Sequence, residues 1–149
     1  MPVQTSGRLA GLDVGDKRIG VAVSDGLDLT AQPLTVINRH AAAADVAAIM
    51  DSLKDYEVRG FVVGLPLLPS GDEGEQADRV RNFCQALEDG SSLPVFFQDE
   101  RLTSRQSERL LIEAGMKRKK RRGVIDKVAA VLILQSYLDF RQPPPEPGL

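Results

Sequence analysis

The sequence of 149 residues has no tryptophan, one cysteine and one histidine. A single cysteine, Cys84, excludes an internal disulfide and suits a reducing compartment, so we expect a cytoplasmic protein. Its place in VRNFCQAL, on the apolar face of an expected helix, indicates core packing rather than a catalytic thiol. The sequence shows no His/Cys group with zinc-ligand spacing, and we expect His40 to be a surface or capping residue.

Long apolar runs are also missing. None approaches the roughly 18 residues that a membrane span requires, and the first residues, MPVQTSGRL, lack the layout of a signal peptide. We therefore expect no membrane partner. The length and the apolar share of 42% suit one domain, which we place at residues 7–140, with a disordered, proline-rich tail at 141–149.

A strong asymmetry lies behind the net charge of −2. Residues 101–128 hold ten Lys/Arg and three acids, a local charge of +7, so the remaining residues carry −9. The centre of this segment is the run KRKKRR at 117–122. Because six adjacent cations repel one another, we expect the run to be mobile until a polyanion orders it, although an ordinary solvated face is the alternative.

Apolar periodicity predicts nine elements. Strands are expected at 7–14, 18–24, 31–37, 59–66 and 94–98, and helices at 41–55, 73–89, 103–114 and 125–139. Pro33 suits an edge strand, and the continuous apolar run at 59–66 suits a strand buried on both faces of a parallel sheet. The order βββαβαβαα predicts an α/β protein with a mixed five-stranded sheet flanked by helices.

The segment GLDVGDKRIGVAVSD (11–25) is the most informative stretch. It predicts a β-hairpin whose first strand carries Asp13 at its buried centre, with Lys17 and Arg18 at the rim. An ionised acid in an apolar strand needs a partner that offsets its desolvation. A metal ion or a basic side chain would serve, and metal-dependent phosphate chemistry uses such an acid.

Two further acids are candidates for the same site. Glu100 follows a strand, where α/β sheets place ligands, and Asp126 opens the last expected helix. Three carboxylates could hold two divalent ions that activate a water and stabilise a leaving oxygen. Alternatively, Asp126 only complements the helix dipole, and Glu100 pairs with Arg101 or Arg105.

Four segments together resemble one family. They are GLDVGDKRIGVAVSD (11–25), VVGLPLLPSGDEGEQADRVRNF (62–83), DERLTS (99–104) and IDKVAAVLILQSYL (125–138). The chain is similar over about residues 8–140 to the YqgF/RuvX family, the Holliday-junction-resolvase-like nucleases. The resemblance implies an RNase H-like fold and a nuclease that uses Mg²⁺ or Mn²⁺, with two ions when substrate is bound.

The resemblance also implies roles for particular residues. Its acids fall on Asp13, on the pair Asp99-Glu100 and on Asp126, which would be the catalytic metal ligands. We favour Glu100 over Asp99; because side chains alternate along a strand, both are not expected to face one metal. The substrate-binding residues would be Lys17, Arg18, Arg101, Lys117, Arg118, Lys119, Lys120, Arg121 and Arg122.

The loop after the fourth strand agrees with the family only in part. Gly64 and Pro66 match a GLP turn that would shape the loop beside the site. However, Leu68 and Ser70 stand where the family usually has Asn and Asp. This difference concerns polar substrate contacts in the loop and leaves the three acids intact.

Several functions remain open at this point. The family resemblance implies either processing of the 5′ end of pre-16S ribosomal RNA or resolution of Holliday junctions. We expect RNA, because one strip of six cations is small for four duplex arms; with few aromatics, base stacking is not expected to dominate. A non-catalytic nucleic-acid-binding module is an alternative, and both monomer and homodimer are possible. Sugar kinase and actin-like ATPases share the first hairpin pattern but need a second domain.

Overall fold

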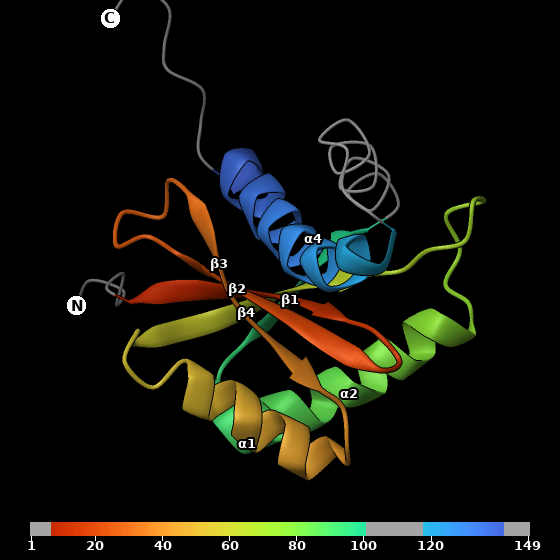
Figure 1. Cartoon of the computed structure of the whole chain (residues 1–149), viewed down its shortest axis with the longest axis horizontal. Helices are drawn as coiled ribbons and strands as arrows, with labels where there is room; N and C mark the ends of the chain where they lie inside the picture. The colour runs from red at the N-terminus through yellow and green to blue at the C-terminus, as the bar shows by residue number, and fades with distance from the viewer. Residues whose placement is uncertain (1–6, 101–117, 142–149) are drawn as a thin grey trace, which may run out of the picture.

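A mixed sheet with helices on both faces forms the core of the structure. The computed structural model describes residues 7–100 and 118–141, and of residues 118–126 and 141 it describes the backbone alone. Figure 1 shows α1 (Ala42–Ser52) and α2 (Glu75–Ser91) below the sheet and α4 (Arg118–Arg141) across its opposite face. The predicted α/β class is therefore confirmed.

The described residues form a five-stranded sheet in the order β3-β2-β1-β4-β5. The strands are β1 Arg8–Val14, β2 Arg18–Ser24, β3 Ala31–Asn38, β4 Val58–Leu65 and β5 Val95–Asp99. The central strand, β1, pairs antiparallel with β2 and parallel with β4, and β4 pairs parallel with β5. All five predicted strands are thus present, with ends that differ by one residue at most.

Two predictions about the position of strands in the sheet are also confirmed. β3, which contains Pro33, lies at one edge of the sheet, which is where proline is found within sheets because it has no N–H to donate. β4 lies between two parallel neighbours, and its residues Phe61, Val62 and Val63 are fully buried. A strand covered on both faces requires such a continuous apolar run.

Each face of the sheet has its own apolar core, because successive side chains of a strand point to opposite faces. Leu12 and Val63 pack with residues of α1 and α2, whereas Leu9 and Val62 pack with residues of α4. α4 approaches closely at Gly11, where an added Cβ would lie 2.6 Å from Cβ of Leu134. A glycine at this position therefore lets the helix lie directly on the backbone of β1.

The last helix begins earlier than the sequence predicts. α4 starts at Arg118 rather than at residue 125, so five of the six cations in the basic run are helical. The predicted helix start at residue 125 was therefore wrong, because Lys and Arg are good helix formers and extend the helix through the basic run. The helix expected at 103–114 and the tail from 142 lie outside the described residues. Among the described helices, none is long and apolar enough to cross a membrane.

Candidate active site

A pocket of about 330 Å³ lies at the carboxyl ends of β1, β4 and β5. Its wall comes from three places that are distant in the sequence. The lining residues are Asp13, Val14, Gly15, Pro66, Leu67, Gln76 and Glu100. The structure therefore brings Asp13 and Glu100 into one hollow, at the sheet edge where α/β proteins place ligands.

Asp13 lies on the face of the sheet that α4 covers. Its neighbours in β1, Leu12 and Val14, point into the core on the other face. Asp13 is half-buried and second to last in the strand, so the prediction of a buried acid at the centre of the strand was wrong. The reason is the pocket: one side of the carboxylate faces the hollow instead of packed side chains.

Glu100 and Asp99 face different surroundings. Glu100 follows β5 directly and lines the pocket, and its N–H donates to the carbonyl of Leu65 at 3.2 Å. Asp99 is exposed and is not part of the pocket wall. From the sequence, side-chain alternation indicated that only one of the two acids would face the site, without showing which. In the structure Glu100, and not Asp99, lines the pocket together with Asp13.

Gly64 makes the room that Glu100 occupies. A Cβ added at Gly64 would lie 3.1 Å from Oε2 of Glu100 and 2.5 Å from Cδ1 of Ile133. The carboxylate and α4 therefore both lie over bare backbone of β4. The glycine of the predicted GLP turn is explained by this close approach, and Pro66 forms part of the pocket wall.

The direction of α4 locates the backbone of Asp126. Ile133 packs at Gly64, in the half of β4 nearest the pocket. The later residue Gln135 binds the N–H of Ala31 and the carbonyl of Leu29, at the opposite end of the sheet. α4 therefore runs away from the pocket, and Asp126 belongs to its pocket-side half. The side chain of Asp126 lies outside the described residues.

The loop between β4 and α2 contributes Pro66 and Leu67 to the pocket wall. The N–H of Leu68 donates to the carbonyl of Asp72, and the N–H of Gly71 to that of Leu68, each at 2.8 Å. Leu68 is half exposed, and Ser70 bonds Asp72. The two departures from the family pattern thus lie in a folded, hydrogen-bonded loop.

Gln76 is a polar residue of the pocket that the sequence reasoning missed. It lies in the first turn of α2, where its carboxamide can both donate and accept. No local motif marks it, since glutamine at a helix start is also common on ordinary surfaces. Only the folding of α2 back toward β1 shows its place beside Asp13.

An ion pair holds the base of this loop. Arg81 binds both carboxylate oxygens of Glu73, with Nη2 2.9 Å from Oε2, and its guanidinium lies 4.6 Å from the ring centroid of Phe97. The hydrogen bond from Arg81 lowers the pKa of Glu73. Glu73 therefore stays ionised to lower pH than an isolated glutamate, and the loop keeps its anchor at neutral pH.

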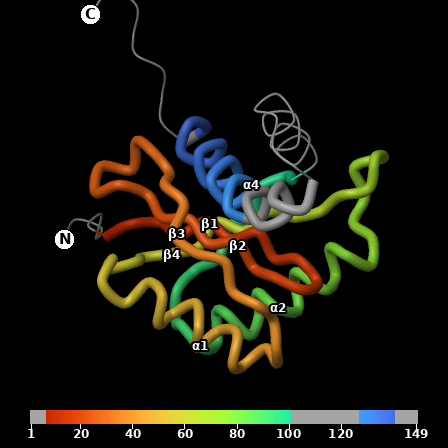
Figure 2. Tube along the Cα trace, in the orientation of Figure 1, coloured from red at the N-terminus to blue at the C-terminus, as the bar shows by residue number. Residues whose placement is uncertain are grey.

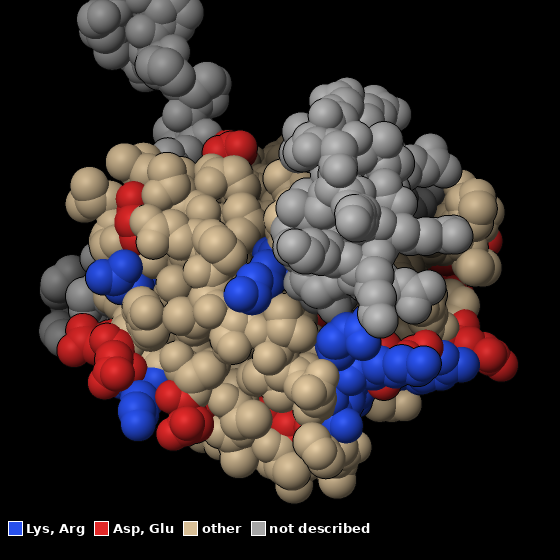
Figure 3. All heavy atoms as spheres, viewed as in Figure 1, with Lys and Arg blue, Asp and Glu red and all other residues tan. Residues whose placement is uncertain are grey.

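Basic side chains surround the β1–β2 turn. Lys17 is exposed, and Arg18 begins β2 on the same face of the sheet as Asp13. Figures 2 and 3 show this turn beside α2 and Lys and Arg side chains gathered there; Arg79 of α2 lies 3.5 Å from Asp16. Arg101 and Lys117 lie outside the described residues, and Arg118 to Arg122 are placed by backbone alone.

Two other residue predictions concern nucleophiles and ligands. Cys84 is buried, and desolvation raises the pKa of its thiol to about 12, so it is a core residue without thiolate character. His40 is exposed, as expected. Its Nδ1 lies 3.1 Å from the carbonyl oxygen of Asn38.

Two solved structures share the fold of this chain. Thermus thermophilus RuvC in complex with Holliday junction substrate has a TM-score of 0.55 and 18% identity, covering 90% of this chain and 96% of that one. Fowlpox virus resolvase with substrate Holliday junction DNA gives 0.57 and 13%, covering 91% and 99%. The likeness shows the fold, which is the RNase H-like fold of RuvC-type nucleases.

Sequence comparison then names the family. The profile of RuvX, described as Holliday junction resolvase, matches residues 7–140. A Moorella thermoacetica protein named "Putative pre-16S rRNA nuclease" is 52% identical over 132 residues, 89% of this chain and 94% of that protein. Its namesake from Natranaerobius thermophilus is 48% identical with the same coverage. The chain belongs to the RuvX family and is a nuclease.

Proposed function

We propose that the protein is a divalent-metal-dependent nuclease that hydrolyses phosphodiester bonds in the 5′ region of pre-16S ribosomal RNA. The observation that carries the proposal is the pocket in which Asp13 and Glu100 meet. The names of relatives that are about 50% identical over most of the chain support the substrate. We propose the cytoplasm as its compartment, as the single reduced cysteine suggests.

The residues at the pocket fit a divalent cation. Carboxylate oxygens are the donors that Mg²⁺ and Mn²⁺ prefer, and Mg²⁺ keeps several ligand positions for water and substrate phosphate. Among the residues with described side chains, no three His, Cys, Asp or Glu are grouped to hold a metal. We propose Asp126 as the third ligand, with Asp13 and Glu100, and a site for two ions when substrate is bound.

Each part of the pocket has a distinct part in the reaction. A bound metal ion would supply a water of lowered pKa and stabilise charge on the phosphate. Asp13 and Glu100 would hold such an ion through their carboxylate oxygens. Pro66 and Leu67 form an apolar wall that restricts water on one side, and the carboxamide of Gln76 can donate to a phosphate oxygen.

Cations on either side of the acids would hold the strand. Lys17 and Arg18 stand at the β1–β2 turn, and the basic start of α4 lies at the pocket end of that helix. One strand threaded past the acids needs only these contacts. The cations of the basic run would then contact the phosphate backbone of that strand.

Cleavage of Holliday junctions is the second candidate, because the family profile carries that description and RuvC shares the fold. A junction requires two paired cuts, which a symmetric dimer would provide. Cleavage of RNA requires only one strand in the site, so a monomer is sufficient for it. The two candidates therefore differ in both substrate and assembly.

A panel of matched substrates tests the proposal. Purified protein with Mg²⁺ or Mn²⁺ is incubated with a 5′-extended 16S precursor fragment, the same sequence as single-stranded DNA, its duplex, and a four-way junction. We expect metal-dependent cleavage of the RNA alone. A stable dimer that cuts junctions symmetrically and leaves RNA intact would favour the second candidate, and binding without cleavage on every substrate would indicate a non-catalytic module.

The basic run is tested separately through salt. Replacing Lys117, Arg118, Lys119, Lys120, Arg121 and Arg122 by Gln should weaken RNA binding and flatten its salt dependence. Each lost phosphate contact lowers the log–log slope by about 0.7 for a single strand. Cleavage at saturating substrate should fall less than affinity. An unchanged slope would show that the run is an ordinary solvated segment.

A further inference from the structure

Arg39, which follows β3, binds the β1–β2 turn at two points. Its Nη1 donates to the carbonyl oxygen of Gly15 at 3.0 Å, and its backbone N–H donates to the carbonyl oxygen of Lys17 at 2.9 Å. The two contacts lie on either side of Asp16, at the tip of the turn. Gly15 itself lines the pocket, two residues after Asp13.

The guanidinium of Arg39 is held from two other directions. Its Nε lies 3.4 Å from Oδ2 of Asp45, a carboxylate that is 1% exposed. Its carbon Cζ lies 5.0 Å from the ring centroid of Phe83 in α2. The other oxygen of Asp45 accepts from the N–H of His40 at 2.8 Å, which fixes the acid at the start of α1. Arg39 thus ties the turn to both α1 and α2.

A buried carboxylate is costly unless it is paired, so Asp45 and Arg39 determine each other's position. The turn that they fix is a tight one, closed by the N–H of Gly15 and the carbonyl of Arg18 at 2.9 Å. An unsupported turn of this length at the rim of an open pocket would move whenever a polyanion pulled on Lys17. Movement there would displace the end of β1, and with it Asp13.

We propose that Arg39, held by Asp45, is a positioning residue of the nuclease site: it fixes the β1–β2 turn so that Asp13 and Gly15 keep their places in the pocket wall. This inference rests on the proposed function for its effect on cleavage. Arg39 itself is not among the residues that line the pocket.

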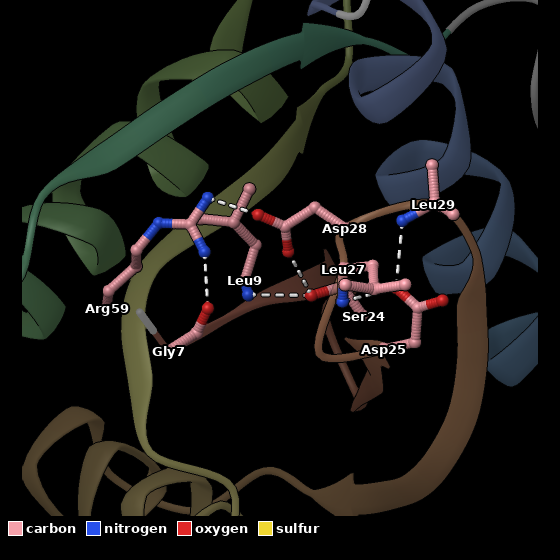
Figure 4. A network of polar contacts seen from close by, with 8 residues as sticks. All are labelled: Gly7, Leu9, Ser24, Asp25, Leu27, Asp28, Leu29 and Arg59. Atoms are coloured by element: carbon pink, nitrogen blue, oxygen red, sulfur yellow. Dashed lines mark hydrogen bonds and ion pairs between the residues drawn. The ribbon is translucent and has the colours of Figure 1, made fainter. Parts of the chain in front are cut away.

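The opposite end of β1 supplies a matched control. Arg59 of β4 binds the carbonyl oxygen of Gly7 and a carboxylate oxygen of Asp28, as Figure 4 shows. It uses the same chemistry as Arg39, an arginine between a carbonyl flanking β1 and an aspartate. Because this end of β1 is remote from the pocket, Arg59→Lys removes a similar anchor without touching the site.

The test compares Arg39→Lys, Asp45→Asn and Arg59→Lys on the 5′-extended RNA. Lysine keeps the charge but cannot bind the carbonyl and the carboxylate in the fork geometry of arginine. We expect kcat to fall at least about ten-fold in Arg39→Lys, with KM changed less than about two-fold, since a displaced ligand mainly affects the transition state. Asp45→Asn should show the same split, whereas Arg59→Lys should retain wild-type kcat and lose only thermal stability.

Hydrogen exchange provides a readout that needs no activity. Exchange of the Gly15 amide should accelerate in Arg39→Lys, while that of the Leu9 amide, which binds Oγ of Ser24, should not. Arg59→Lys should do the reverse. If Gly15 is unaffected, or if Arg39→Lys and Arg59→Lys lower kcat equally, the inference is wrong. If the wild type cleaves no substrate, the proposed function has failed, and the exchange pattern still decides whether Arg39 fixes the turn.

Discussion

The two ends of β1 are held by the same device and serve different purposes. At one end Arg39 joins the carbonyl of Gly15 to Asp45; at the other, Arg59 joins the carbonyl of Gly7 to Asp28. The difference lies in what stands beside each anchor. Next to Gly15 two acids line a hollow of about 330 Å³, whereas the Asp28 end is a closed network.

The closed end shows how a polar cluster serves the fold. Ser24 is 1% exposed, accepts from the N–H of Leu9 at 2.9 Å and donates to Asp28 at 2.7 Å. Asp28 has a φ of 57°, a left-handed conformation that aspartate tolerates better than most residues. Because these polar groups form hydrogen bonds with one another, little of their hydrogen-bonding capacity is available to a ligand. Carboxylates in an open pocket, by contrast, keep a face toward solvent.

The largest effect should come from the acids of the pocket. Asp13→Asn and Glu100→Gln should each reduce kcat at least about 100-fold, because losing a metal ligand costs several kcal/mol of transition-state stabilisation. Thermal stability should be unchanged or higher, since two like charges in one pocket repel. Single-turnover cleavage and thermal unfolding of the metal-free proteins measure both.

Asp28→Asn is the control for that pair. It removes an acid of the same kind from the closed end, so stability should fall while cleavage per folded molecule stays at the wild-type value. A folded Asp13→Asn protein that keeps more than about a tenth of the activity would contradict the assignment of the pocket.

The next largest effect should be structural. Ser24→Ala removes the acceptor of the buried Leu9 N–H, and an unsatisfied buried donor costs about 1–3 kcal/mol. Urea unfolding should show this loss with an unchanged m-value. Ser70→Ala, in the exposed loop at the pocket end, is the control and should be near neutral. Equal losses of unfolding free energy in Ser24→Ala and Ser70→Ala would mean that the hydrogen bonds of Ser24 stabilise the fold no more than those of the exposed loop.

The acids of the pocket could be predicted from the sequence, whereas the arginine anchors at the two ends of β1 could not. The motif at 11–25 identified Asp13 and its hairpin, and the end of β5 identified Glu100, because strands and strand ends follow from local patterns. Arg39 could not be predicted, since its carbonyl partner lies 24 positions away and no motif links them. The burial of Asp13 was predicted incorrectly because the pocket is open on one side of its carboxylate. The start of α4 was predicted incorrectly because Lys and Arg favour helix even in a run of like charges.

Cys84 offers a smaller test, on a region remote from both ends. Its folded-state pKa of about 12 lies above that of an unfolded thiol, so the associated stability is present below the unfolded value and is lost as pH rises toward 12. The difference in unfolding free energy between the wild type and Cys84→Ala should therefore shrink from pH 8 toward alkaline pH. A constant difference would contradict the burial of the thiol, and rapid alkylation of the native protein would do so as well.

The smallest effect concerns the loop at the pocket end. Because Arg81 lowers the pKa of Glu73, the ion pair stabilises the fold above the unfolded pKa of glutamate and is lost as pH falls through the lower folded value. Wild type and Glu73→Gln should differ slightly in melting temperature at pH 7, and the two curves should converge on acidification. Melting curves that stay parallel down to pH 3 would show that the pair does not anchor the loop.

The central claim is that the pocket end of β1 binds the metal. Fe²⁺ in place of Mg²⁺, with ascorbate and peroxide, generates radicals that cut the polypeptide close to the bound ion, and mass spectrometry locates the cuts. We expect cuts near Asp13, Pro66 and Glu100 that excess Mg²⁺ and the Asp13→Asn substitution both suppress. Cuts that persist in Asp13→Asn, or that map to the Asp28 end, would contradict the account.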